Sequence, residues 1–314
     1  MEFETRRLSY LAPYDWDAAL AFLARRAIDG VEQVEAGIYR RTIGYNGLTG
    51  TIEIAHDREN TALLATVRAP RAILGVAMER LRCMFDLDAD LQAIEAYLAR
   101  DSAMAPLVAA RPGLRVFRGW DRFEVAVRSV IGQQVSVEHA RRLNGTLVSR
   151  CGSDLPQGSD DGLGKLFPTA RQILDANLAG IGMPGARVAT LIALARAATD
   201  NPRLFHRANS MHETIARLRC IRGIGDWTAH YIAMRACGEP DAFPAGDVGL
   251  LRGATDAKGR RPTPSELLAR AERWRPWRAY AAHQLWARDE ANRRHQEQES
   301  SPKGREFMTR CPTL

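Results

Sequence analysis

The chain has 314 residues, of which 46% are apolar, and this length allows two or three compact units with sizeable cores. Its formal net charge of +7 favours a polyanionic partner such as a nucleic acid. Only three of the 44 basic residues are lysines, namely Lys165, Lys258 and Lys303. Because a high genomic GC content produces the same arginine bias, charge alone does not establish nucleic-acid binding.

The five cysteines are dispersed along the chain, and no two of them form a C-x-x-C pair. This pattern argues against a disulfide framework, a zinc site of ordinary spacing and an iron–sulfur cluster. No apolar run is long enough to span a membrane, and the N-terminus lacks a charged-then-apolar signal. We therefore predict a reduced cytoplasmic location, in a bacterial cytosol or nucleoid, and no membrane partner.

The first third of the chain has a mixed α/β pattern. Asn46-Gly47 is a strong hairpin signal between two strand-like runs. In the second run Ile52 and Ile54 alternate with other residues, so one face of that strand is expected to be buried. We expect a helix at 18–27, strands at 38–45, 48–55 and 63–67, and a covering helix at 71–84. These elements predict a small antiparallel sheet with helices on one side.

Arg111-Pro112-Gly113 interrupts the pattern, and we place a domain boundary there. The N-terminal α/β domain is then 1–113, and the region 114–289 is expected to form two helical subdomains with a cleft between them. Beyond 121 the expected helical runs are 121–131, 135 onwards, 168–179, 185–198, 211–220, 227–237, 264–273 and 276–287. The polar stretch 290–314 lacks periodicity, and its charges nearly cancel, so we predict a disordered tail. The predicted fold class is α+β.

A Gly-Ile-Gly turn at 223–225 stands between two helical runs, in LRCIRGIGDWTAHY. Glycine at both ends of the turn permits positive φ and lets another backbone approach. The next helix starts near Asp226, so its free N–H groups point into the same space. Such a site suits a DNA phosphate, held without reading base sequence. The apolar contacts of this helix–hairpin–helix would come from Leu218, Ile221 and Ile224.

An ordinary helix-capping turn is the more common explanation of a lone G-I-G, and we assign the copy at 180–182 to such a structural role. The turn at 223–225 differs because Trp227 and Tyr231 follow it on one helix face. Asp247 comes about twenty residues later, in Phe-Pro-Ala-Gly-Asp. Taken alone, an aromatic pair of this spacing is more often core, and such an aspartate is more often a helix cap.

Together, LRCIRGIGDWTAHY and AFPAGDVGLL resemble the helix–hairpin–helix base-excision glycosylases, whose signature is this hairpin plus an aspartate about twenty residues on. Three further blocks extend the resemblance to the DNA-3-methyladenine glycosylase II family, over roughly residues 8–289. These blocks are PYDWDAALAFLARRAI, RPGLRVFRGWDRFEVAVRSVIGQQVS and ERWRPWRAYAAHQLW. The combination is specific, although no single block is.

The resemblance implies that Asp247 is the catalytic carboxylate, and that Trp227, Tyr231 and Trp286 line the pocket for a base flipped out of duplex DNA. An alkylated purine such as 3-methyladenine carries positive charge, so electron-rich rings can hold it by stacking and cation–π attraction. That charge also makes the base a good leaving group. Asp247 would stabilise the oxocarbenium-like sugar and orient or deprotonate the attacking water.

Relatives that also cut the strand carry a lysine two residues after the second hairpin glycine, where it forms a Schiff base. Trp227 holds that position here, so we predict a monofunctional glycosylase that leaves an abasic site. Gly246 stands where a second acid is sometimes found, which leaves the pH behaviour open. Gln134 matches the segment that wedges into the gap left by the flipped nucleotide, with less apolar character than in the best-known relative.

The same likeness implies the remaining contacts. DNA is expected to meet Gly223, Ile224, Gly225, Thr228 and Gln134. A monovalent cation, Na⁺ or K⁺, is expected at the backbone carbonyls of Arg219, Ile221 and Ile224. No cofactor is expected to be required, and the partner is double-stranded DNA containing alkylated bases, bound by a monomer.

Three rival functions compete with this prediction. A non-catalytic helix–hairpin–helix DNA-binding module would leave Asp247 and the three rings as coincidence. A bifunctional oxidised-base glycosylase is opposed by the lysine-free hairpin, and a small-molecule enzyme by the lack of a Walker loop, an H-E-x-x-H motif or a dinucleotide fingerprint. Lesion preference among 3-methyladenine, 7-methylguanine, ethenoadenine and hypoxanthine stays open. We expect the N-terminal domain to support the helices rather than catalysis.

Overall fold

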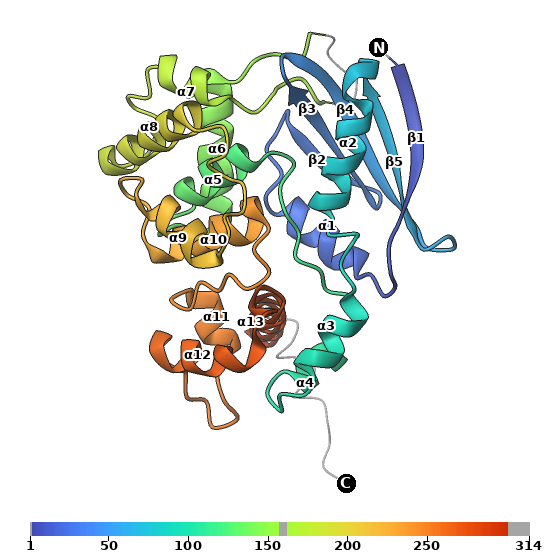
Figure 1. The fold of residues 1–314 in the computed structure, drawn as a ribbon, viewed down its shortest axis with the longest axis vertical. Coiled ribbons are helices and arrows are strands. Elements are labelled where there is room, and N and C mark those ends of the chain that lie inside the picture. The colour runs from blue at the N-terminus through green and yellow to red at the C-terminus, as the bar shows by residue number, and fades with distance from the viewer. Residues whose placement is uncertain (1, 157–161, 301–314) are drawn as a thin grey trace.

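The computed structural model describes residues 2–156 and 162–300, with a sheet domain beside a helical region (Figure 1). Five strands form one antiparallel sheet in the order β1-β5-β4-β3-β2. The strands are β1 Glu2–Ser9, β2 Glu32–Glu35, β3 Ile38–Tyr45, β4 Leu48–Asp57 and β5 Ala62–Ala69. The predicted fold class, an antiparallel sheet followed by an all-α region, is confirmed.

Three of the five strands lie where the alternation of side chains predicts them, whereas β1 and β2 are not predicted. β1 is an edge strand with mostly exposed side chains, so it carries no alternating apolar pattern. β2 has only four residues, Glu-Gln-Val-Glu. Backbone pairing with β5 and β3 holds both strands, and that pairing requires no side-chain pattern.

Two helices pack against this sheet, α1 Trp16–Ala24 and α2 Arg71–Met84 (Figure 1). α2 matches its predicted range. α1 begins at Trp16 rather than at residue 18, because the side chain of Asp15 accepts the Ala18 N–H and caps the helix. The shared core of the sheet and the two helices includes Trp16, Tyr39, Ile54, Leu63, Leu81 and Phe85.

The helical region has its own, larger core. Its first helices, α3 Leu91–Leu98 and α4 Ala105–Ala110, precede residue 113, yet their buried side chains belong to this core. The further elements are α5 Arg122–Ile131, α6 Val137–Cys151, α7 Ala170–Asp175, α8 Gly185–Asp200, α9 Met211–Arg219, α10 Asp226–Ile232, the π-helical turn η1 Ala233–Cys237, α11 Val248–Gly253, α12 Pro264–Ala271, the 3₁₀ turn η2 Glu272–Trp274 and α13 Arg278–Ser300. Within the described ranges, no helix is long and apolar enough to cross a membrane.

The last helix is longer than expected. α13 continues to Ser300, so the prediction of a disordered tail is wrong for 290–300; the remainder of that tail lies outside the described residues. Apolar periodicity ends before this point, but ion pairs replace it as the stabilising contacts. These pairs are Arg252–Asp289, Arg25–Glu290, Arg293–Asp289 and Arg294–Glu290.

A buried ion-pair network joins the sheet domain to the helical region. Arg41 of β3 contacts Glu124 of α5 at 2.7 Å, and Arg128 of α5 contacts Glu32 of β2 at 2.6 Å. Arg128 also bonds to Glu124, while the Tyr39 hydroxyl donates to Glu32 at 2.8 Å. Burial alone would raise the pKa of Glu124, but Arg41 and Arg128 lower it below its usual range. Each charge in this network therefore has an oppositely charged partner. The network fixes the position of the sheet domain against the helical region.

Substitution of Arg41 by methionine should weaken this junction, because Glu124 then keeps only one of its two cationic partners. We expect Arg41→Met to lower the free energy of unfolding by about 3–5 kcal/mol, measured by urea denaturation. The matched control is Arg40→Met, since Arg40 is also on β3 but pairs with the half-exposed Glu53 of β4. That variant should lose less than about 1 kcal/mol. Equal losses in the two variants would contradict a special role for the buried network.

Candidate active site

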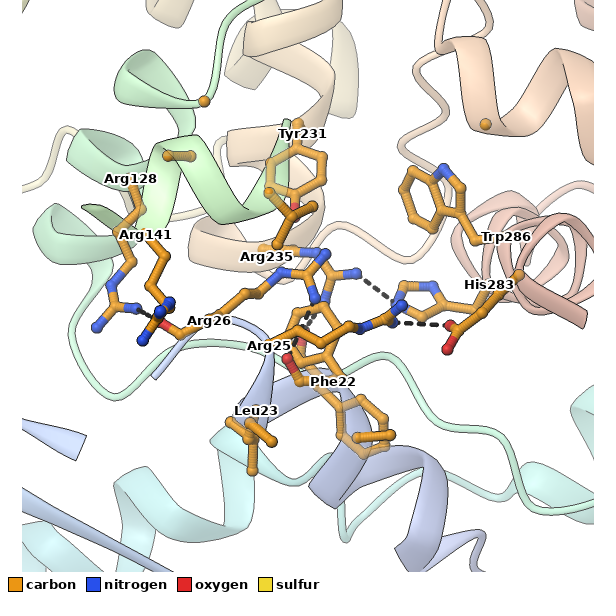
Figure 2. Close-up of a pocket in the computed structure, with 18 of the residues that line it drawn as sticks. Phe22, Leu23, Arg25, Arg26, Arg128, Arg141, Tyr231, Arg235, His283 and Trp286 are labelled. Atoms are coloured by element: carbon orange, nitrogen blue, oxygen red, sulfur yellow. Dashed lines mark hydrogen bonds and ion pairs between the residues drawn. The ribbon is translucent and has the colours of Figure 1, made fainter. Parts of the chain in front are cut away.

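A cleft of about 1240 Å³ lies between the sheet domain and the helical region. One wall comes from α1, and the others come from α5, α6, α10, η1, α11 and α13 (Figure 2). Phe22 of α1 and Arg26, which follows that helix, therefore line the same space as Asp247 and Trp286. The N-terminal domain supplies part of the cleft surface in addition to the support expected of it.

Asp247 is the residue on which three hydrogen bonds converge. Its Oδ2 accepts the indole N–H of Trp227 at 2.9 Å, and its Oδ1 accepts the indole N–H of Trp286 at 2.8 Å. Oδ1 also accepts the backbone N–H of Leu250 at 3.0 Å, so Asp247 caps α11 as well. Every partner is a donor, which suits an ionised carboxylate because that group only accepts.

The three rings predicted to line the pocket meet around this carboxylate. Trp227 and Tyr231 share one face of α10, with ring centroids 5.3 Å apart and planes only 17° from parallel. Tyr231 meets the ring of Trp286 edge-on at 6.1 Å, and Trp286 comes from α13. The three residues that the sequence predicts for the pocket therefore lie next to one another in the fold.

Gly249 is a part of the site that sequence reasoning missed. A Cβ at this position of α11 would lie 3.0 Å from Cδ1 of Trp286 and 3.1 Å from Oδ1 of Asp247. Only glycine therefore lets the indole and the carboxylate approach each other here without displacement. The sequence signal is a glycine two residues after the predicted acid, inside a helix, where glycine is unfavourable.

The hairpin has the predicted arrangement, with α9 leading into the turn and α10 leaving it, and Leu218, Ile221 and Ile224 are buried. Gly223 has φ +86°, and a Cβ there would lie 1.9 Å from Oγ1 of Thr190 on α8, so both conformation and packing require glycine. Gly225 is different. Its φ is −84°, so the prediction of positive φ is wrong for Gly225. It begins α10 without a side-chain cap, and the space beside it is open.

Thr228 and Gln134 have opposite environments. Thr228, predicted to contact DNA, is only 3% exposed, and its hydroxyl accepts a hydrogen bond from Gln133 Nε2 at 2.9 Å. Its side chain is therefore unavailable to DNA, because it is buried and its hydroxyl is bonded to Gln133. Gln134 is exposed and has φ +55°, an uncommon conformation for a residue other than glycine.

Gln133 links two predicted DNA contacts, and sequence reasoning did not assign it this role. Its amide nitrogen donates to the Gly223 carbonyl at 3.1 Å as well as to Thr228. Its own carbonyl accepts from Arg187 of α8 at 2.5 Å. The loop carrying Gln134 is thereby fastened to the hairpin.

The predicted cation ligands are backbone carbonyls, which are suitable donors for a hard cation. The Ile221 carbonyl already accepts the Ile224 N–H at 3.0 Å, as part of the turn. Cation binding by Arg219, Ile221 and Ile224 stays a prediction. Within the described residues, no cluster of three or more His, Cys, Asp or Glu side chains could hold a metal ion.

Arg235 and His283 form a buried polar pair at the floor of the cleft (Figure 2). His283 Nδ1 lies 2.8 Å from the Ala279 carbonyl, and Nε2 lies 2.9 Å from Arg235 Nη2. Since a carbonyl only accepts and a guanidinium only donates, the imidazole is neutral, with its proton on Nδ1. Burial lowers the pKa of His283 well below its usual range, and the charge of Arg235 lowers it further. In the sequence, Arg235 follows Trp227 and Tyr231 at the same four-residue spacing, which places all three on one helix face. This spacing was the sequence signal that could have identified Arg235 as a cleft residue.

His283 should make stability depend on pH. Its pKa is depressed in the folded state, so only the unfolded state takes up a proton as the pH falls below about 6.5. Stability is then present above that pH and is lost below it, by up to about 1.4 kcal/mol per pH unit. We expect a shallower loss in His283→Gln between pH 6.5 and 5, measured by urea denaturation. Identical slopes for the two proteins would contradict this assignment.

Two family models match the two parts of the chain. Residues 5–121 match the family model of the AlkA N-terminal domain, and residues 127–279 match that of the HhH-GPD superfamily base excision DNA repair proteins. The chain is 32% identical to DNA-3-methyladenine glycosylase 2 of Escherichia coli, over 89% of this chain and 95% of that protein.

A second relative is longer than this chain. The chain is 34% identical to the probable bifunctional transcriptional activator/DNA repair enzyme AlkA of Mycobacterium tuberculosis, over 89% of this chain but only 56% of that protein. The fold is shared with the 3-methyladenine DNA-glycosylase from Archaeoglobus fulgidus, with a TM-score of 0.79 and 21% identity over 91% of this chain and 98% of that chain. The chain therefore belongs to the DNA-3-methyladenine glycosylase 2 family, within the helix–hairpin–helix superfamily of base-excision repair proteins.

Proposed function

We propose that this protein is a DNA glycosylase that flips an alkylated base of the 3-methyladenine type out of duplex DNA and hydrolyses its N-glycosidic bond, leaving an abasic site. One observation carries the proposal: Asp247 is held by two indole N–H groups and one backbone N–H in a cleft that its aromatic partners line. A non-catalytic DNA-binding module would have no use for a carboxylate oriented by three donors.

The chemistry follows from the position of this carboxylate. Breaking the bond between base and sugar leaves positive charge on the sugar, and a fixed negative charge stabilises it. Asp247 has both oxygens engaged, so it is oriented before the substrate arrives and needs no rearrangement. Water adds its oxygen to the sugar and releases a proton to the solvent, and the electron pair of the broken bond leaves with the base, so a cationic base departs neutral. Asp247 orients that water, while the rings of Trp227 and Tyr231 stack on the extruded base.

The hairpin and the Gln134 loop would hold the DNA. Gly223, Ile224 and Gly225 present backbone groups at a turn where the space beside Gly225 is open. A monovalent cation on the carbonyls of Arg219, Ile221 and Ile224 would add positive charge at the same turn. Gln134, exposed at the tip of its loop, would fill the gap left by the flipped nucleotide. The monomeric state and the cytoplasmic location stay predictions.

The absence of strand cleavage is part of the proposal. Strand-cutting relatives need an amine that attacks the sugar, and Trp227 stands at the position of that lysine. Among the described residues that line the cleft, none is a lysine. Base release without nicking is therefore the expected reaction.

Release of free base from methylated duplex DNA tests the function directly. Wild type should release 3-methyladenine and leave an intact strand with an abasic site. Asp247→Asn keeps the size of the side chain but removes its charge, so release should fall by about 10²–10³-fold while DNA binding is retained. If wild type binds DNA and releases no base, the hairpin is a clamp without chemistry and Asp247 is a helix cap. Nicking by wild type would refute the monofunctional assignment.

Gly249 offers a test of the geometry around the acid. An added methyl group in Gly249→Ala would press on both Trp286 and Asp247, so base release should fall about tenfold or more. Stability should change little, because the better helix propensity of alanine, about 1 kcal/mol, offsets part of the strain of that contact. The control is Gly246→Ala, whose added Cβ would meet no atom within 4 Å. Equal activity in these two variants would show that the close approach at Gly249 is not needed.

A further inference from the structure

Two glycines of α11 allow this helix to lie against the backbone of α13 (Figure 1). A Cβ at Gly253 would lie 2.0 Å from the carbonyl oxygen of Leu285, and a helical backbone cannot easily shift away. Gly249 lies one turn earlier on the same face of α11, where a Cβ would press on Trp286. Because the distance between packed helices depends on the side chains at their contact, the two glycines bring α11 closer to α13 than larger residues would permit.

A contact between glycine and backbone does not by itself fix how α11 is oriented on α13. Van der Waals attraction is non-directional, and α11 has only six residues, so few backbone hydrogen bonds stiffen it. Arg252 of α11 supplies a directional contact. Its Nε donates to Oδ1 of Asp289 on α13 at 2.7 Å, and its Nη2 donates to Oδ2 at 2.8 Å. Two parallel bonds between planar groups fix the orientation of the pair as well as its distance.

This ion pair connects the same two helices as one of the hydrogen bonds to Asp247. Asp247 immediately precedes α11, and Arg252 lies in the last turn of that helix. Trp286 and Asp289 are three residues apart on one face of α13. The helices are therefore joined at two points, by the 2.8 Å bond from Trp286 to Asp247 and by the ion pair. A segment joined at one point can pivot there, and the second connection removes that freedom.

Burial of Asp289 makes its pair with Arg252 stronger than an ordinary surface contact. Asp289 is only 6% exposed, and both of its carboxylate oxygens accept from Arg252. Water therefore competes less for these bonds than at an exposed pair. The hydrogen bonds with Asp289 raise the pKa of Arg252 above its ordinary value, and the charge of Asp247 acts in the same direction. Arg293 also contacts Asp289, at 3.7 Å, but it belongs to α13 itself and cannot tie that helix to α11.

From this geometry we propose that Arg252 is a positioning residue: its bidentate pair with Asp289 holds α11 on α13, so that the indole of Trp286 keeps the Asp247 carboxylate oriented for base release. This inference rests on the proposed glycosylase function and deepens it. Arg252 acts through Trp286 and does not itself need to touch the substrate. Loss of the pair should therefore slow the chemical step and leave DNA affinity unchanged, since the hairpin and the Gln134 loop belong to other elements.

Single-turnover release of 3-methyladenine, with the protein in saturating excess over the duplex, tests this proposal. Arg252→Met should slow release about tenfold, while the dissociation constant for the duplex stays within about twofold of wild type. Arg252→Lys keeps the charge but loses the planar fork, so its rate should fall between the two. The control is Arg294→Met, because Arg294 also lines the cleft but pairs with Glu290 of its own helix. That variant should release the base at the wild-type rate.

A double-mutant cycle separates positioning from a general structural role. Trp286→Phe removes the indole N–H through which Arg252 is proposed to act. Arg252→Met should then cause little further loss of rate in the Trp286→Phe protein, because the two changes break one connection. Losses that multiply would show that Arg252 acts independently of Trp286, and a loss confined to DNA affinity would make it a DNA contact. Either result would overturn the proposal.

The indole N–H of Trp286 also gives a test that needs no activity. In protein labelled with ¹⁵N-tryptophan, its resonance is the one of six that Trp286→Phe removes. It should move upfield in Arg252→Met, and less far in Arg252→Lys, because its hydrogen bond to the carboxylate weakens. Arg294→Met should leave it in place. An unmoved resonance would refute the proposal, and Arg252→Lys decides the matter if Arg252→Met does not fold. If wild type releases no base, the glycosylase function fails, and this resonance still tests Arg252 separately.

Discussion

The candidate site depends on one carboxylate that two indoles from different helices share. Trp227 on α10 and Trp286 on α13 each donate their ring N–H to Asp247, which begins α11. An indole N–H lies in the plane of its ring, so each hydrogen bond also restricts how that ring can rotate. The contacts that orient the charge thus also set the aromatic walls. Removal of either indole would disturb both the electrostatics and the shape of the cleft.

Local signals explain why much of this could be predicted. The strand pairing around Asn46-Gly47 and the turn at Gly223 depend on conformations that few residue types adopt, so the sequence reveals them directly. Trp227 and Tyr231 follow the turn at helical spacing, and this places them on one face. Trp286 came only from the resemblance, because no local pattern relates α13 to a hairpin more than fifty residues earlier.

The parts that could not be predicted depend on contacts between distant segments. Phe22 reaches the cleft only because the buried charges of Arg41 and Glu124 fix the sheet domain against α5. Arg235 looked like one more arginine in a basic chain, and its position among the rings of Phe22, Tyr231 and Trp286 becomes visible only when every neighbour is placed. The extension of α13 has the same origin, since its ion pairs include Arg25, which follows α1, and Arg252 of α11.

Gln133 has a mechanical consequence. Its amide ties the Gln134 loop to the hairpin turn at Gly223, so the spacing between the two surfaces is set by the protein. In the proposed complex the protein would then hold the loop and the hairpin at a fixed spacing, and the duplex would have to bend to contact both. Deforming a duplex requires less free energy where stacking or pairing is already weakened. Damaged sites, which are easier to deform, would thus be distinguished from undamaged DNA before any base enters the cleft.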